Sequence, residues 1–363
     1  MSARSLAKTD GGKLRIGIVG AGYWGPNLAR NFHASPDWVL AAVCDLDRAR
    51  AEAVAALVPG TPVVTSLAEL LEGNDIDAVA IATPARTHHS VTEAALEAGK
   101  HVMVEKPLAD TGERGRDMVR HASDSGLILM ADHTYCYTPA VVKIRELIEE
   151  GALGDILFID CIRINLGLIQ PDVDVFWDLA PHDLSIMDFV LPGGLRPLAV
   201  SAHGADPLGA GKACVGYLSL PLQHGAMAHV HVNWLSPTKV RHMIIGGTRR
   251  TLVWDDLNPQ QRLSIYDRGV DLSLALQQLD GADRADAAIS YRLGDTWSPA
   301  LPEREALGAM VTEFAASIRE KRAPMTDGEA GLRVLGILEA ARTSLARSGA
   351  AVVPVGEPQM EGS

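Results

Sequence analysis

Short runs of consecutive apolar residues alternate with amphipathic stretches between residues 14 and 131. The runs are LRIGIVG, WVLAAVCD, TPVVTS, IDAVAIATP, KHVMVEKP and GLILMA, and the helical segments between them include RTHHSVTEAALEAG, which ends on Gly99. Apolar runs without alternation are typical of strands buried on both faces, and glycine is favoured just after a helix. The pattern predicts an α/β domain with six strands in a doubly wound parallel sheet.

The hydrophobic pattern changes after Asp132. A predicted helix, TPAVVKIRELIEEGALG, leads to strands that alternate apolar and polar residues, as in AMAHVHVNWL. Strict alternation indicates a sheet with two unlike faces. Helical sequence returns in EREALGAMVTEFAASIREKR and EAGLRVLGILEAARTSLARSG. The sequence therefore predicts a second, α+β domain with a large, mainly antiparallel, open-faced sheet.

These patterns divide the 363 residues into two predicted domains. Residues 1–132 form the first, with a disordered lead-in over 1–13 that is polar and lacks an apolar leader segment. Residues 133–363 form the second, which we expect to bind substrate and mediate oligomerisation, with a loose tail from about 354 to 363. The length suits two domains, since single cores seldom exceed about 250–300 residues.

Composition narrows the class of protein. The chain is 47% hydrophobic and 21% charged, with a net charge of −12 that argues against nucleic-acid binding. No apolar run approaches the roughly 20 residues of a membrane span. Four cysteines lie far apart in the sequence, which favours free thiols over disulfides or a zinc site. We expect a cytoplasmic protein without a metal site.

The segment IGIVGAGYWGPNLARNF places Gly20, Gly22 and Gly25 between a strand and an amphipathic helix. In a Rossmann domain the first of three such glycines permits a tight turn, the second lets the backbone approach a pyrophosphate, and the third allows close helix packing. Helix N-termini favour phosphate. The motif predicts a dinucleotide site, with Tyr23 and Trp24 of the loop as further candidates.

Asp45 ends the second predicted strand, twenty residues after Gly25. A carboxylate there accepts hydrogen bonds from the adenosine ribose and repels a 2′-phosphate, which favours NAD over NADP. The fourth strand ends in IATPARTHH, so we expect Thr83, Pro84 and His88 to line the crevice where the strand order reverses. The His88–His89 pair could equally be the exposed start of a helix.

Two segments could supply acid–base chemistry. Lys106 follows the fifth strand and precedes a proline, but taken alone it could equally be a surface lysine. The segment WDLAPHDLSIM contains Asp178 and His182 four positions apart. Taken alone it indicates a helix start, with Asp178 as the cap and Pro181 in the first turn. The residues themselves do not distinguish these alternatives.

The combination GAGYWG, CD, ATP, EKP and WDLAPHD, followed by TDGEAGLRVLGILEAA, resembles the Gfo/Idh/MocA family of NAD(P)-dependent oxidoreductases from about Leu14 to Ala346. The segments GYWGPNLARNF and RINLGLIQPDVDVFWDLAPHDLSIM are similar to members from bacterial polysaccharide and aminosugar pathways. Those include dehydrogenases that oxidise the C3 hydroxyl of a nucleotide sugar or glycoside.

The resemblance implies a role for each matching residue. Lys106 would be a catalytic lysine, commonly beside a cis proline, and Asp178 with His182 would be the catalytic pair of the second domain. Thr83, Pro84, Glu105 and Lys106 match cofactor-contacting positions. The candidates for substrate binding are Tyr137, Arg163, Asn165 and Trp177. Thr138 and its neighbours depart from the family's common Asn-Pro variant, so the resemblance does not define the substrate pocket there.

These residue types suit the oxidation of a secondary alcohol. Histidine can accept a hydroxyl proton near neutral pH, and a lysine can stabilise alkoxide charge. Together with the resemblance, they imply a hydride transfer between nicotinamide and the C3 hydroxyl of a sugar, nucleotide sugar or aminosugar precursor. Alternatives are inositol or free-sugar dehydrogenase, 3-ketosugar reductase, NAD-dependent glycosidase, or a non-catalytic NAD-binding regulator.

His229 and His231 alternate with apolar residues on one predicted strand. The pair could suggest metal binding, but an exposed or oligomer-facing sheet explains the alternation better. We therefore expect a homo-oligomer, which the family resemblance implies is a homodimer or homotetramer.

Overall fold

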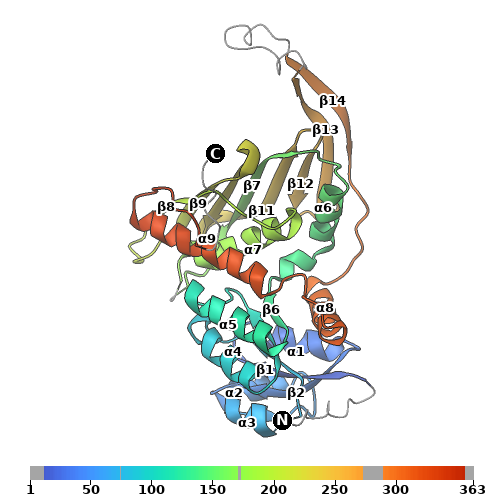
Figure 1. Ribbon diagram of the computed structural model, residues 1–363, viewed down its shortest axis with the longest axis vertical. Helices are drawn as coiled ribbons and strands as arrows, with labels where there is room; N and C mark the ends of the chain where they lie inside the picture. The colour runs from blue at the N-terminus through green and yellow to red at the C-terminus, as the bar shows by residue number, and fades with distance from the viewer. Residues whose placement is uncertain (1–11, 74, 171–172, 273–288, 356–363) are drawn as a thin grey trace. The chain divides into compact units, whose positions relative to one another are not determined.

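The computed structural model describes residues 12–73, 75–170, 173–272 and 289–355 (Figure 1). Contacts divide the chain into two compact units. Unit 1 comprises Met1–Thr138 and Glu303–Glu339, and unit 2 comprises Pro139–Pro302 and Ala340–Ser363. The expected disordered lead-in (1–13) and loose tail (about 354–363) lie outside the described residues except at 12–13 and 354–355.

Unit 1 contains the predicted parallel sheet. Its strands run in the order β3-β2-β1-β4-β5-β6, and every neighbouring pair is parallel. The strands are β1 (Leu14–Val19), β2 (Trp38–Cys44), β3 (Val63–Val64), β4 (Ala78–Ile81), β5 (His101–Glu105) and β6 (Leu129–Asp132). All six strands match the six apolar runs, which confirms the doubly wound α/β prediction. The order reverses between β1 and β4.

Helices connect these strands and cover the sheet. They are α1 (Gly25–Ala34), α2 (Arg48–Ala55), α3 (Leu67–Gly73), α4 (His88–Glu97) and α5 (Gly112–Ser125). α1 buries Leu28 and Phe32, and the ring of Phe32 meets that of Trp38 edge to face at 5.3 Å. α5 begins at the cap Thr111 and ends at Gly126, whose φ of 65° continues the chain in the left-handed region.

Residues 303–339 return to unit 1, which the predicted two-segment division does not include. They contain α8 (Ala306–Glu320) and most of α9 (Gly328–Ala346). Trp38 explains the attachment: its indole N–H donates to the carbonyl of Val311 at 2.9 Å, and its ring stacks on Phe314. Burial of these aromatic rings joins segments about 270 positions apart.

Unit 2 is built on an eight-stranded sheet in the order β14-β13-β12-β11-β7-β10-β9-β8. β7 and β10 pair in parallel and the other neighbours pair antiparallel, which confirms the mainly antiparallel prediction. The strands are β7 (Ile156–Leu166), β8 (Ser201–Ala205), β9 (Val215–Pro221), β10 (Met227–Asn233), β11 (Leu235–Gly247), β12 (Thr251–Asp255), β13 (Leu263–Leu272) and β14 (Ile289–Trp297).

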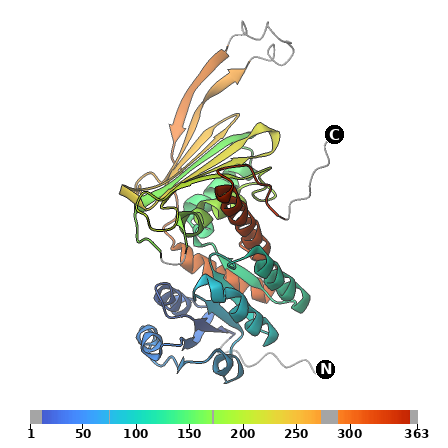
Figure 2. The same cartoon turned by 90° about the vertical axis from the view of Figure 1, so that its left-hand side faces the viewer.

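The two faces of this sheet differ as predicted. α6 (Pro139–Glu149) contacts α7 (Val175–Val190), and α7 packs on β7, β9 and β10. Toward the core, Ala228, Val230 and Val232 of β10 are buried. On the opposite face Tyr217 is 52% exposed and stacks on His231. β13 and β14 extend past the other strands as a two-stranded ribbon (Figures 1 and 2).

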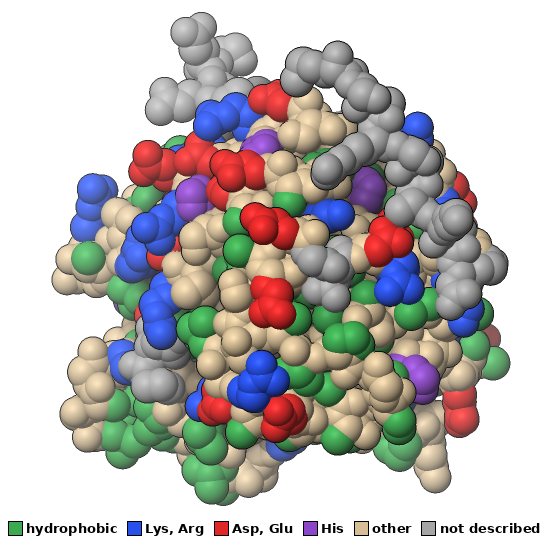
Figure 3. All heavy atoms as spheres, turned by 90° about the horizontal axis from the view of Figure 1, so that it is seen from below, with side chains coloured by type: hydrophobic (Ala, Val, Ile, Leu, Met, Phe, Trp, Pro, Cys, Tyr) green, Lys and Arg blue, Asp and Glu red, His purple; other side chains and the backbone are tan. Residues whose placement is uncertain are grey.

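Among the helices of the described residues, none combines the length and the apolar run needed to cross a membrane. Acidic and basic side chains are interspersed on the face drawn in Figure 3.

Candidate active site

The glycine-rich loop of unit 1 has the geometry of a phosphate-binding turn. Gly20 has a φ of +102°, and a Cβ there would lie 2.6 Å from the backbone of Ala82. A Cβ on Gly25 would lie 2.7 Å from the carbonyl oxygen of Gly20, so both positions exclude larger residues. Gly22 is exposed, and nothing lies within 4 Å of its Cβ position. The backbone at Gly22 is therefore accessible to a dinucleotide pyrophosphate, at the N-terminus of α1.

Asp45 lies directly beside this loop. Its Oδ2 accepts a hydrogen bond from the backbone N–H of Ala21 at 2.7 Å, and its Oδ1 accepts one from Asp47 at 2.8 Å. The carboxylate thus fixes the loop and stays half-buried at the end of β2, the position of a ribose-binding acid. The neighbouring Tyr23 is 92% exposed. These residues fit a dinucleotide.

Trp24 connects the glycine-rich loop to the carboxyl end of β6, the strand at one edge of the sheet. Its indole Nε1 donates to Oδ2 of Asp132 at 2.7 Å, and the hydroxyl of Thr134 donates to the other carboxylate oxygen. Burial raises the pKa of Asp132, while the bonds from Thr134 and Trp24 and the charge of Lys106 act against that rise. Asp132 was not among the expected site residues. Its position could have indicated a site residue, because it is an acid at the carboxyl end of β6, paired in register with Glu105 of β5.

Lys106 lies immediately after β5, and the Lys106–Pro107 peptide bond is cis. Thr83 and Pro84 follow β4, which pairs with β5 in parallel. Thr83, Pro84 and Lys106 therefore lie at the carboxyl ends of two neighbouring strands. The sheet geometry therefore brings together in unit 1 the expected cofactor positions and the candidate catalytic lysine. His88 belongs to the same region, but its side chain is 1% exposed and lies in the core rather than in a crevice.

The helix that carries Asp178 and His182 begins earlier than the local sequence indicated. Asp174 is the cap of α7, with Oδ1 accepting from the N–H groups of Phe176 and Trp177 at 3.0 Å each. The interpretation of Asp178 as the cap and Pro181 as a first-turn residue is therefore wrong. Asp178 lies in the first turn, and Pro181 lies inside the helix, where it has no N–H to donate to the carbonyl of Trp177.

α7 is buried along almost its whole length. Of its sixteen residues only Asp178, Leu179 and His182 are not buried. Because residues four apart lie on the same side of a helix, Asp178 and His182 share the accessible face. Apolar burial fixes the helix, so the position of both polar groups is set by the core of unit 2.

The carboxylate of Asp178 has a buried partner. The indole Nε1 of Trp234, a residue 1% exposed, donates to Oδ2 of Asp178 at 3.0 Å. Asn165 belongs to the same cluster: a Cβ on Gly167 would lie 3.0 Å from the Asn165 amide and 3.1 Å from the Trp234 ring. Thus β7, α7 and the β10–β11 junction bring Asn165, Asp178 and Trp234 together in unit 2. Trp234 was not among the expected site residues.

Three other substrate candidates are buried. Arg163 is 3% exposed, and its Nε and Nη2 donate to Asp183 at 3.0 and 2.8 Å. Tyr137 bonds to the hydroxyl of Thr326 at 3.0 Å, and burial raises the pKa of its phenol well above the usual value. Trp177 is buried, with the Arg342 guanidinium over its ring. Each of these three side chains is therefore held by a partner within its own unit.

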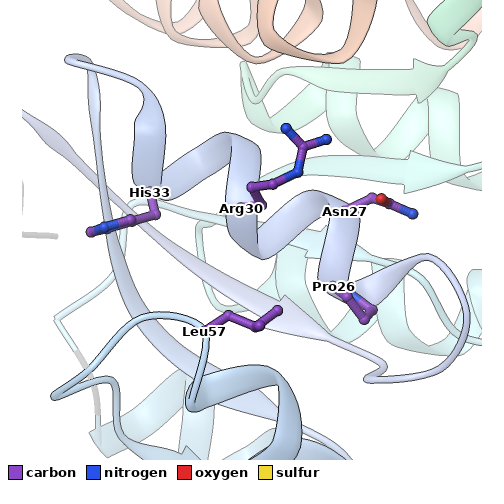
Figure 4. Close-up of a pocket in the computed structure, with 5 residues that line it drawn as sticks. All are labelled: Pro26, Asn27, Arg30, His33 and Leu57. Carbon is purple, nitrogen blue, oxygen red and sulfur yellow. The ribbon is translucent and has the colours of Figure 1, made fainter.

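A cavity of about 330 Å³ lies along α1 in unit 1 (Figure 4). Its lining residues are Pro26, Asn27, Arg30, His33 and Leu57. None of them is a predicted site residue, and Arg30 is paired with Glu305 at 2.6 Å.

Family comparisons agree with this architecture. Residues 14–133 match the model described as the oxidoreductase family, NAD-binding Rossmann fold, and residues 141–253 match the GFO/IDH/MocA C-terminal domain. The chain belongs to the Gfo/Idh/MocA family of oxidoreductases. The predicted resemblance is thereby confirmed, and with it the class of enzyme.

Several relatives of this oxidoreductase are named as dehydrogenases. A UDP-N-acetylglucosamine 3-dehydrogenase of Acidithiobacillus ferrooxidans is 30% identical over 325 residues, which cover 89% of this chain and 94% of that protein. Its solved structure matches with a TM-score of 0.77 over 93% of this chain and 99% of that one. A scyllo-inositol 2-dehydrogenase (NADP(+)) of Bacillus subtilis is 27% identical, over 91% of this chain and 93% of that protein.

Proposed function

We propose that the protein is an NAD-dependent dehydrogenase that oxidises the C3 hydroxyl of a nucleotide sugar of the UDP-N-acetylhexosamine class. One observation carries the proposal. In a chain 30% identical to a UDP-N-acetylglucosamine 3-dehydrogenase over 89% of its length, the largely buried helix α7 leaves only Asp178, Leu179 and His182 accessible. The accessible pair is an acid and a base of the types that this oxidation needs.

The proposed roles follow from the chemistry of the side chains. NAD, held at the glycine-rich loop beside Asp45, would supply the acceptor for the hydride that leaves the sugar carbon. His182 accepts the hydroxyl proton, because a histidine can exchange a proton near neutral pH. The ammonium of Lys106 stabilises the negative charge that develops on the same oxygen. Asp178, held by Trp234, orients the imidazole or a neighbouring sugar hydroxyl.

The preference for NAD over NADP is part of the proposal and rests on Asp45. Its carboxylate lies beside the glycine-rich loop, bonded to Ala21 and Asp47, where its charge would repel a 2′-phosphate. The name of the Bacillus subtilis relative specifies NADP(+), so the family does not fix this choice.

We also propose that a second copy of this chain covers the face of the unit 2 sheet opposite α7. Tyr217, Tyr291 and Leu293 are 52%, 73% and 85% exposed in this sheet, and aromatic residues are enriched in protein interfaces. Multi-angle light scattering should give a dimer or tetramer, and a monomer would contradict this part. We expect a cytoplasmic enzyme, in keeping with four buried free thiols.

The experiment that tests the function follows reduced nicotinamide by absorbance with a panel of substrates. The panel contains UDP-N-acetylglucosamine, other nucleotide sugars, free aminosugars and inositols, each with NAD and with NADP. The proposal predicts the highest kcat/KM with a UDP-N-acetylhexosamine and NAD, and loss of turnover with retained NAD binding in Lys106→Ala. Highest activity with inositol would instead favour an inositol dehydrogenase, the function named for the Bacillus subtilis relative. NAD binding without turnover of any substrate would favour a regulator.

A further inference from the structure

The imidazole of His88 links two backbone segments of unit 1. Its Nδ1 lies 2.9 Å from the carbonyl oxygen of Pro107, and its Nε2 lies 2.8 Å from the carbonyl oxygen of Thr83. Thr83 follows β4, and Pro107 follows Lys106 at the end of β5. One buried ring therefore contacts both the segment of the expected cofactor contacts and the segment of the candidate catalytic lysine.

Both contacts use acceptor oxygens. A neutral imidazole has a single N–H, so it donates to one of the two carbonyls, and only the doubly protonated ring donates to both. Burial lowers the pKa of His88, while the carbonyls of Pro107 and Thr83 and the charge of Asp110 act in the opposite direction. In either protonation state the ring donates at least one hydrogen bond. Replacing His88 by an apolar residue would therefore leave a buried carbonyl without its N–H donor.

The Thr83 segment has further local support. The hydroxyl of Thr87 lies 2.7 Å from the carbonyl of Pro84 and 2.8 Å from the Thr83 hydroxyl. Those bonds stay within the segment itself. The contact of the His88 Nδ1 with the carbonyl of Pro107 instead reaches a second segment, nineteen positions away from the ring along the chain.

We propose that His88 is a positioning residue for Lys106. By holding the backbone of Pro107 to that of Thr83, the ring fixes the orientation of the lysine relative to the Thr83–Pro84 segment. His88 then acts through backbone geometry and does not itself contact cofactor or substrate. The part that concerns catalysis rests on the proposed function, whereas the link between the two segments does not.

Amide hydrogen exchange of the full chain without ligand tests the link directly. In His88→Leu, peptides that contain residues 82–87 and 105–111 should exchange about 10-fold faster or more, because the link that restrains them is lost. His88→Gln, whose amide carries N–H donors, should recover much of the protection. The matched control is His89→Leu, which changes the neighbouring histidine and should exchange as wild type does. Wild-type exchange of both segments in His88→Leu overturns the proposal.

A second measurement does not depend on His88→Leu, in case that variant does not fold. In protein labelled with ¹⁵N-histidine, a His88 ring N–H held by a carbonyl should give a proton signal in slow exchange with water, identified by its absence in His88→Gln. A His88 ring whose protons all exchange freely contradicts the link.

Kinetics with NAD and UDP-N-acetylglucosamine then test the effect on Lys106. If the lysine is misplaced, kcat should fall about 10-fold or more in His88→Leu, with a smaller change in the Kd for NAD and partial recovery in His88→Gln. Equal kcat in wild type and His88→Leu would overturn the positioning role. If the wild type oxidises no sugar, the proposed function fails, while the exchange data still decide whether the link exists.

Discussion

The indole Nε1 of Trp234 donates a 3.0 Å hydrogen bond to Oδ2 of Asp178. The donor belongs to a buried side chain, whereas the acceptor lies on the accessible face of α7, one helical turn before His182. The core of unit 2 thus fixes the direction of a carboxylate that is partly available to a ligand. This relationship gives Asp178 both a structural and a proposed chemical role, which variants can separate.

Asp178→Asn keeps an acceptor for Trp234, so its free energy of unfolding should stay near that of wild type. Asp178→Ala leaves the indole N–H buried without that acceptor and should destabilise the fold by about 1–3 kcal/mol. Both variants should lose kcat if the charge acts on His182 or the sugar. Urea unfolding and steady-state kinetics measure the two effects. Wild-type kcat in Asp178→Asn would remove the charge from the mechanism.

Asp45→Asn tests the cofactor preference. The variant removes the negative charge but keeps an oxygen for the N–H of Ala21. The ratio of kcat/KM with NAD to that with NADP should fall about 10-fold or more, because repulsion of the 2′-phosphate is reduced. Asp47→Asn, in which the nearby helix cap loses its charge but keeps an acceptor, is the matched control. An unchanged ratio in Asp45→Asn would show that another residue sets the preference.

The buried ion pair of Arg163 and Asp183 should behave as a structural unit. Each side chain is 3% exposed, so removing one partner leaves a buried charge. Arg163→Met and Asp183→Leu should each cost about 3–5 kcal/mol of unfolding free energy, and the double variant should cost less than the sum. Chemical denaturation of the four proteins gives the coupling energy. Additive losses would argue against a coupled pair.

His101 should make the fold less stable in mild acid. Burial lowers its pKa to about 4, and its Nδ1 accepts the N–H of Ile128 at 2.9 Å, which requires an unprotonated nitrogen. The unfolded chain binds the proton at a higher pH than the folded one. The stability contribution of the neutral ring is therefore complete above pH about 6.5 and is lost as the pH falls toward 4, by up to about 1.4 kcal/mol per unit.

Urea unfolding across that pH range measures the loss. His101→Asn keeps an acceptor but does not titrate, so its stability should fall less steeply with decreasing pH. His33→Asn, at an exposed position of α1, is the control and should follow the wild type. Equal slopes for His101→Asn and the wild type would contradict the prediction.

Much of unit 1 could be predicted because its signals are local. Each buried strand is a short apolar run, and the glycine-rich loop has its turn, approach and packing residues within six positions. The attachment of residues 303–339 could not be predicted, because it depends on the contact of Trp38 with Phe314 and Val311. Such a contact leaves no periodic signal in either segment.

In the candidate site, too, local features could be predicted from the sequence and long-range contacts could not. Asp174 and Asp178 are equally good cap types, and only the helical geometry from Val175 onward distinguishes them. Arg163 shares the side of β7 on which Ile159 and Cys161 are buried, so alternation could have indicated its inward direction. Its partner Asp183 lies on a different element, twenty positions later. Sequence patterns therefore identify residue types at the right strand ends, while side-chain partners require the fold.

Hydride transfer from a labelled sugar tests oxidation at C3 itself. The wild-type enzyme is incubated with NAD and UDP-N-acetylglucosamine that carries deuterium at C3, and the reduced nicotinamide is analysed by mass spectrometry. Oxidation at C3 should give reduced cofactor that contains one deuterium, and unlabelled cofactor when the deuterium is placed at C4. Reduced cofactor without deuterium from the C3-labelled sugar, or no reduction with this substrate, would contradict it.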